Sequence, residues 1–334
     1  MSFSTLLRIS RPRFRHYVLW PVLLLYAYIW SLPAIQMSLA WWYPGNGMII
    51  VLMMIGLLGY FSFPANLWIY GWNDIADTDT DIYNSKKWNY ENKIDSTWNS
   101  TAQLKRAIWL RNIAYILCFS VIFSVLIPYQ DYLLFDTPST VSWLLWLRVC
   151  VTCIALFLPF LITSYLYSCP PLRAKAKPWI DGLMNILYII TPLIIGALVS
   201  RESRNAIVHS APDTVFRWGY IITIAFPALC RCMAMHCYSA IPDIDADRQA
   251  WLTTTAVYLG KQKALIYCGI LYLVSAIFSF STLWWMSIVG GIVYLTMIGI
   301  SYCYEDIFWL YKKFPLINLI IGFCLFRYIL LFYS

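Results

Sequence analysis

Nine long apolar runs are the feature that most limits what this chain can fold into. They lie at approximately residues 17–41, 48–70, 107–128, 141–166, 181–200, 215–240, 264–283, 285–303 and 314–333. A helix needs about 20 mainly apolar residues to cross the roughly 30 Å of hydrocarbon in a bilayer. Each run is about that long, so we expect an all-α, polytopic membrane protein with nine transmembrane helices.

The composition supports a membrane location over a soluble one. Hydrophobic residues make up 61% of the chain and charged residues only 12%, whereas globular proteins carry about 25% charged residues. A water-facing surface cannot be built from so few charges. The same numbers exclude a disordered chain.

The positions of lysine and arginine predict the orientation in the membrane. Of the 24 lysines and arginines, 17 fall in the N-terminal segment and the loops at 71–106, 167–180, 241–263 and 304–313. Cytoplasmic loops carry such an excess. We therefore expect an integral protein of the cytoplasmic membrane, with its N-terminus inside and its basic N-terminal segment lying against membrane lipid. The net charge of +8 is accounted for in this way and gives no reason to expect nucleic acid.

Two acidic clusters lie in cytoplasmic segments that adjoin long apolar runs. At 3.6 residues per turn, Asn73, Asp77 and Asp81 would fall within an arc of roughly 80° on one helical face. In the second cluster, Asp243 and Asp247 are neighbours at i and i+4. Asp79 and Asp245 should point elsewhere.

Clusters of this kind favour a metal–diphosphate site over two solvated acidic loops. Packed carboxylates repel one another unless cations neutralise them. Mg²⁺ prefers such oxygen ligands and is often shared between one or two carboxylates and substrate phosphates. Bound Mg²⁺ would stabilise charge on a departing diphosphate, which is the chemistry of ionising an allylic diphosphate.

Taken together, these motifs resemble the UbiA superfamily of intramembrane prenyltransferases over essentially the whole chain. Longer segments resemble its lycopene elongase branch, which is linked to C50 carotenoids and bacterioruberin. These segments are Ser10-Arg-Pro-Arg-Phe14, Phe63-Pro-Ala-Asn66-Leu, Tyr70-Gly-x-Asn-Asp74, Tyr167-Ser-x-Pro-Pro-Leu-Arg173-x-Lys175 and Met233-Ala-Met-His236-x-x-Ser-Ala-Ile-Pro-Asp243. The resemblance implies one domain over residues 1–334, a helical bundle around a central cavity.

The resemblance also implies an activity, a cofactor and site residues. The expected enzyme transfers alkyl groups other than methyl, moving a dimethylallyl group from dimethylallyl diphosphate (DMAPP) to the end of a polyene such as lycopene. The expected Mg²⁺ ligands are Asn73, Asp77, Asp81, Asp243 and Asp247, and the four aspartates are the expected catalytic residues. Arg173 and Lys175 are expected to hold the diphosphate, although loop charges can also serve only to set the topology.

Three further polar residues allow more than one interpretation. Asn66 and His236 each lie seven residues before a motif, about two turns deeper in the membrane. They are candidates for substrate binding, His236 also for accepting a proton at the end of the reaction, and equally for hydrogen bonding between helices. Asp181 fits a helix start best but lies near the basic loop.

Two other functions stay open at this point. An aromatic prenyltransferase of the same superfamily would attach a prenyl tail to a quinone precursor. A transporter with paired acidic cation sites would place its acids nearer the middle of the membrane, on broken helices.

Overall fold

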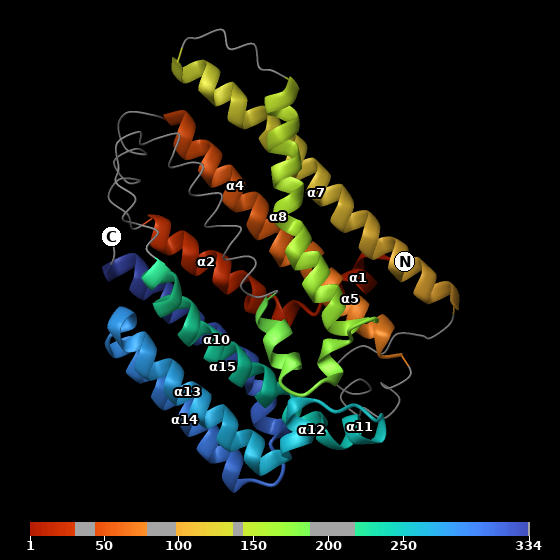
Figure 1. The fold of residues 1–334 in the computed structure, drawn as a ribbon, viewed down its shortest axis with the longest axis vertical. Coiled ribbons are helices and arrows are strands. Elements are labelled where there is room, and N and C mark those ends of the chain that lie inside the picture. The colour runs from red at the N-terminus through yellow and green to blue at the C-terminus, as the bar shows by residue number, and fades with distance from the viewer. Residues whose placement is uncertain (31–43, 79–97, 136–142, 188–217, 333–334) are drawn as a thin grey trace.

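The computed structural model of this chain describes residues 1–30, 44–78, 98–135, 143–187 and 218–332 (Figure 1). Every regular element in these ranges is a helix, which agrees with the expected all-α class. The N-terminal part contains α1 (Phe3–Ile9), η1 (Pro12–Phe14), α2 (His16–Trp30), α4 (Pro44–Ser62), α5 (Pro64–Ala76), α7 (Trp98–Phe135) and α8 (Trp143–Ser168). The C-terminal part contains η4 (Ala174–Ala176), α10 (Trp218–Ala240), η6 (Ile241–Asp243), α11 (Ile244–Gln249), α12 (Thr255–Leu259), α13 (Lys261–Leu283), α14 (Trp285–Cys303) and α15 (Phe308–Phe332). A further helix begins at residue 180 and is described to residue 187.

Six helical segments in the described ranges are long and apolar enough to cross a membrane. They are Leu52–Ala76, Ser100–Leu126, Cys150–Ser168, Lys261–Leu283, Trp285–Cys303 and Phe308–Leu331. They correspond to the second, third, fourth, seventh, eighth and ninth expected spans. The other three spans run partly outside the described residues, so the number nine stays a prediction.

The second expected span is divided into two helices. α4 ends at Ser62, Phe63 has φ −136° and ψ −61°, and α5 begins with Pro64. Proline lacks a backbone N–H and favours the first position of a helix, so the chain starts a new helix at this point. The run at 48–70 predicted a continuous helix and missed this break.

The helices pack around two main apolar clusters. One cluster joins side chains of α2, α4, α5, α7 and α8, and includes Leu57, Tyr60 and Phe157. The other joins side chains of α10, α13, α14 and α15 with residues of the short helices that follow α10. Figure 1 shows α11 and α12 at the same end of the bundle as α1 and the end of α5. Both acidic motifs therefore lie towards one end of the molecule.

Candidate active site

The first acidic motif lies where α5 ends. The backbone N–H of Asp77 donates to the carbonyl of Asn73 at 3.0 Å, and Nδ2 of Asn73 donates to Oδ2 of Asp77 at 2.9 Å. Because α5 ends at Ala76, the helical arc does not extend to Asp81, which lies outside the described residues. The terminal carbonyls of a helix carry partial negative charge, so this end of α5 attracts cations in addition to its carboxylate.

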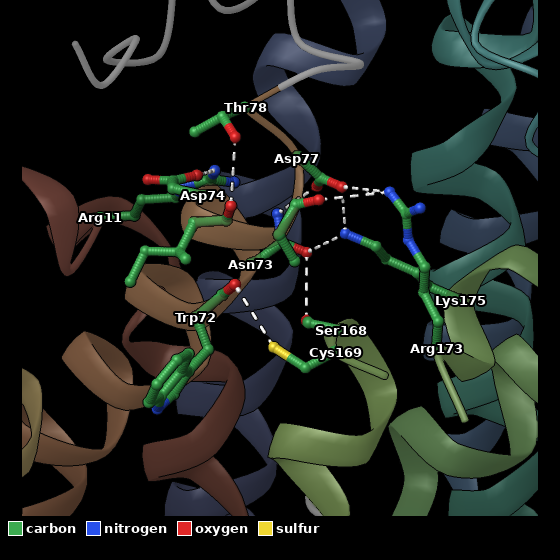
Figure 2. A network of polar contacts seen from close by, with 12 residues as sticks. Arg11, Trp72, Asn73, Asp74, Asp77, Thr78, Ser168, Cys169, Arg173 and Lys175 are labelled. Atoms are coloured by element: carbon green, nitrogen blue, oxygen red, sulfur yellow. Dashed lines mark hydrogen bonds and ion pairs between the residues drawn. The ribbon is translucent and has the colours of Figure 1, made fainter. Parts of the chain in front are cut away.

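The loop after α8 delivers two cations to this carboxylate (Figure 2). Nζ of Lys175 donates to Oδ1 of Asp77 and, at 3.2 Å, to Oδ1 of Asn73. Nη2 of Arg173 lies 3.6 Å from Oδ1 of Asp77 and donates to the carbonyl of Ala76 at 3.2 Å. Ser168, the last residue of α8, donates to Oδ1 of Asn73 at 3.3 Å. Both expected diphosphate-binding residues therefore contact an expected metal-binding motif.

This cluster is buried, and one of its polar atoms has no hydrogen-bond partner among the described residues. Asp77 and Lys175 are only 9% and 8% exposed, and among the described residues Nε of Arg173 has no hydrogen-bond partner although it is buried. Left-handed backbone at Arg173, with φ 42°, turns the chain so that its side chain points to the end of α5. Amide and carboxylate oxygens of this kind suit Mg²⁺, and the spare guanidinium donor suits a phosphate oxygen. The residues present fit a metal and a diphosphate.

Asp74 lies in the same motif as Asp77 but forms an ion pair with a different part of the chain. Its Oδ1 accepts a hydrogen bond of 2.6 Å from Nη2 of Arg11, and its side chain is 2% exposed. The guanidinium of Arg11 also lies 4.7 Å from the ring centre of Tyr70. This contact attaches the N-terminal segment to the site helix, and no signal in the sequence alone pointed to it.

The second acidic motif divides as its spacing predicts. The side chain of Asp245 is 92% exposed, and its Oδ1 lies 3.7 Å from Nη1 of Arg248. Asp243 and Asp247 are partly buried, and Oδ2 of Asp247 accepts a long hydrogen bond of 3.5 Å from Thr254. Within the described ranges, no three acidic, histidine or cysteine side chains form a preformed metal cluster. The assignment of metal ligands therefore stays a prediction.

Asp181 and His236 form a buried pair next to this region. Asp181 is fully buried and accepts hydrogen bonds from the backbone N–H of Thr255 at 2.8 Å and from its hydroxyl at 2.5 Å. Nε2 of His236 lies 3.6 Å from Oδ2 of Asp181. The ring of Tyr167 packs edge-on against His236 at 5.8 Å. The next residue of α8, Ser168, contacts Asn73, so the end of α8 connects the Asp181–His236 pair with the first motif.

Asn66 lies in the first turn of α5, just after the break between α4 and α5. Its Nδ2 donates to the carbonyl of Phe61 at 2.6 Å, and its side chain is fully buried. Its Oδ1 has no partner among the described residues. Its described contact satisfies a carbonyl that the break in the helix leaves unpaired, which favours the structural interpretation of Asn66.

Cys169 is a part of the site that the sequence did not single out. Its Sγ lies 3.9 Å from the carbonyl of Trp72 as a weak donor. Burial raises the pKa of the Cys169 thiol, and the positive charge of Lys175 only partly opposes this. The side chain is therefore a neutral thiol at neutral pH, a packing group between α8 and α5.

The sequence is similar to curated proteins over most of its length. No family model matches the sequence. The chain is 30% identical over 321 residues to a lycopene elongase/hydratase of Haloarcula japonica, covering 95% of this chain and 88% of that protein. It is 29% identical over 285 residues to a lycopene elongase/hydratase of Halobacterium salinarum, covering 82% and 78% of the two chains.

Solved structures of similar fold come from Archaeoglobus fulgidus. One is a UbiA homologue with a TM-score of 0.52 and 16% identity, covering 97% of this chain and 98% of that chain. Another is a UbiA homologue bound to DMAPP and Mg²⁺, with a TM-score of 0.50 and 15% identity, covering 96% and 99%. At these identities the comparison shows the fold alone.

Proposed function

Because the chain belongs to the lycopene elongase branch of the UbiA superfamily of intramembrane prenyltransferases, we propose that it transfers the prenyl group of DMAPP to the end of a carotenoid such as lycopene, with Mg²⁺ as cofactor. The observation that carries this proposal is the contact of Lys175 and Arg173 with Asp77 and Asn73. Membership in an enzyme family sets aside the transporter.

Mg²⁺ would be held by Asn73, Asp77, Asp81, Asp243 and Asp247, and would supply stabilisation of the negative charge on the departing diphosphate. In this proposal the four aspartates are catalytic through that role. Of these, Asp77 follows α5 directly, and Asp243 and Asp247 belong to the η6–α11 segment, so the ligands would come from parts of the chain far apart in sequence.

Lys175 and Arg173 would bind oxygens of the diphosphate. Both already lie at the end of α5, so little rearrangement is needed to exchange a carboxylate oxygen for a phosphate oxygen. Charge-assisted hydrogen bonds of this kind are stronger than neutral ones. Asn66 and His236 would lie deeper, near the allylic group, with Asn66 fixing the bend between α4 and α5.

The reaction needs no covalent enzyme intermediate. When the C–O bond of DMAPP breaks, its electron pair leaves with the diphosphate, and the allylic cation remains in the apolar interior. The terminal double bond of the acceptor then forms the new C–C bond. Proton loss or addition of water ends the reaction.

Location and domain organisation follow as part of the same proposal. The excess of lysine and arginine in the loops supports an N-terminus and a site at the cytoplasmic face of the cell membrane, where a soluble diphosphate would arrive, with residues 1–334 acting as one domain surrounded by membrane lipid. Nucleic acid has no role.

The experiment is an assay of purified protein in detergent with Mg²⁺, DMAPP and lycopene, read by mass spectrometry for added C5 units. Asp77→Asn is expected to lower turnover by about 100-fold or more, as for the loss of one charge-stabilising group. Asp245→Asn is the matched control, because its carboxylate is 92% exposed, and it should keep wild-type turnover. Product with 4-hydroxybenzoate but not with lycopene would favour the aromatic prenyltransferase instead.

A further inference from the structure

We propose that His236, positioned by Asp181, is the catalytic base that takes a proton from the water that ends the reaction. This inference rests on the proposed transfer to a polyene and adds the residue that acts in its last step. It concerns the tertiary cation that remains on the acceptor after the new C–C bond has formed.

The depth of His236 suits this step. It lies on α10 seven residues before Asp243, or about 10 Å along a helix. This places His236 on the apolar side of the second acidic motif, the side from which a polyene in the membrane would approach. His236 packs on Tyr167 of α8, and the next residue of α8, Ser168, donates to Asn73, so the end of α8 contacts both His236 and the first motif.

The orientation of the ring leaves one nitrogen available. Nε2 faces Oδ2 of Asp181 at 3.6 Å, so the carboxylate favours the tautomer with its proton on Nε2. Nδ1 has no protein partner in the described part of the chain, and 12% of the side chain is exposed. Nδ1 is therefore the atom that can accept a proton.

Asp181 is built to hold this orientation. Its carboxylate is fixed by both polar groups of Thr255, and the hydroxyl of Thr255 in turn accepts from the backbone N–H of Trp179 at 2.7 Å. No lysine or arginine of the described residues lies within ion-pair distance of this fully buried carboxylate. Its charge is thus available to stabilise the imidazolium that forms when His236 takes a proton, the role of the aspartate in a catalytic triad.

The step balances without an oxidant or a further cofactor. A lone pair of the water oxygen forms a C–O bond to the tertiary cation. One O–H bond of that water breaks, its electron pair stays on oxygen, and the proton moves to Nδ1 of His236. The product is a tertiary alcohol, and His236 later returns the proton to solvent. Without this base, the cation loses a proton from a neighbouring carbon and forms an alkene.

The test uses the full-length protein in ¹⁸O-labelled water with Mg²⁺, DMAPP and lycopene. The readout is the ratio of hydrated to alkene product for each elongated end. The wild type is expected to place label in the product. His236→Gln should lower the ratio by about 100-fold, at the low end of what a general base contributes. Asp181→Asn should lower the ratio of hydrated to alkene product by a smaller factor. If Asp181 had a purely structural role, its loss would lower both products together and leave the ratio unchanged.

The controls separate the possible failures. His16→Gln changes a histidine on α2, outside the site, and should keep the wild-type ratio. If His236→Gln does not fold, His236→Phe keeps the edge-on packing with Tyr167 and gives the same readout. An unchanged ratio in a folded His236 variant overturns the inference. Wild-type elongation without label also overturns it but leaves the proposed function standing, whereas no elongation at all overturns both.

Discussion

The ion pair between Lys175 and Asp77 leads to a quantitative prediction about stability. Replacing Lys175 by methionine removes one of the two cations that the described residues bring to a carboxylate only 9% exposed. The remaining cation, Arg173, lies 3.6 Å away. With an effective dielectric constant of about 20, two unit charges at that distance attract by about 5 kcal/mol before desolvation is subtracted.

Breaking a buried pair by removing one partner costs about 3–5 kcal/mol, because the other charge is left buried and uncompensated. Since Arg173 still neutralises part of the charge, we expect Lys175→Met to lower the free energy of unfolding by about 3 kcal/mol, the low end of that range. The double variant with Asp77→Asn should lose less than the sum of the two single losses, because the buried carboxylate that Lys175→Met leaves under-compensated is then absent.

The assay is unfolding in mixed detergent micelles, followed by tryptophan fluorescence. Lys177→Met is the matched control on the same loop, because Lys177 is exposed, and it should change the free energy of unfolding by less than about 0.5 kcal/mol. Additive losses in the double variant, or a loss for Lys175→Met no larger than the control, would refute the reasoning.

The other predictions concern three separate contacts. Arg11→Met leaves buried Asp74 without its 2.6 Å partner, so the N-terminal segment should become cleavable by protease at lower protease concentration. Gly322→Ala would bring a Cβ to within 2.3 Å of the indole nitrogen of Trp20 and should lower the free energy of unfolding by about 1–3 kcal/mol. A Cβ at Gly290 meets open space, so Gly290→Ala should lower the free energy of unfolding far less. Because burial raises the pKa of Cys169, maleimide should label it more slowly at neutral pH than Cys303, the exposed last residue of α14, and equal rates would contradict this.

Much of the architecture could be predicted because hydropathy reports directly on membrane-spanning helices. The break at Phe63 was missed, since a proline at the start of a helix and a proline inside a run look alike in a hydropathy pattern. The end of α5 at Ala76 was missed for a related reason: helical periodicity carries no information on where a helix stops.

The sequence predicted candidate residues of the site, but not which of them contact one another. The spacing of Asp243, Asp245 and Asp247 predicted which side chain points away, because neighbours within one turn obey helical geometry. The contact between Arg11 and Asp74, and the one between His236 and Asp181, each join segments far apart in the chain. Only tertiary packing determines such pairs, so no local pattern could have revealed them.

Two consecutive threonines contact two of the carboxylate groups that the proposals use. Thr254 donates to Asp247 in the acidic motif, and Thr255 donates to Asp181 beside His236. Any ligand that draws Asp247 to a new position therefore acts on the backbone that fixes Asp181. By thermodynamic linkage, the reverse holds with equal free energy. We therefore expect occupancy of the diphosphate site and the state of the terminating base to be coupled, and a measurement of either one as a function of the other would report their coupling free energy.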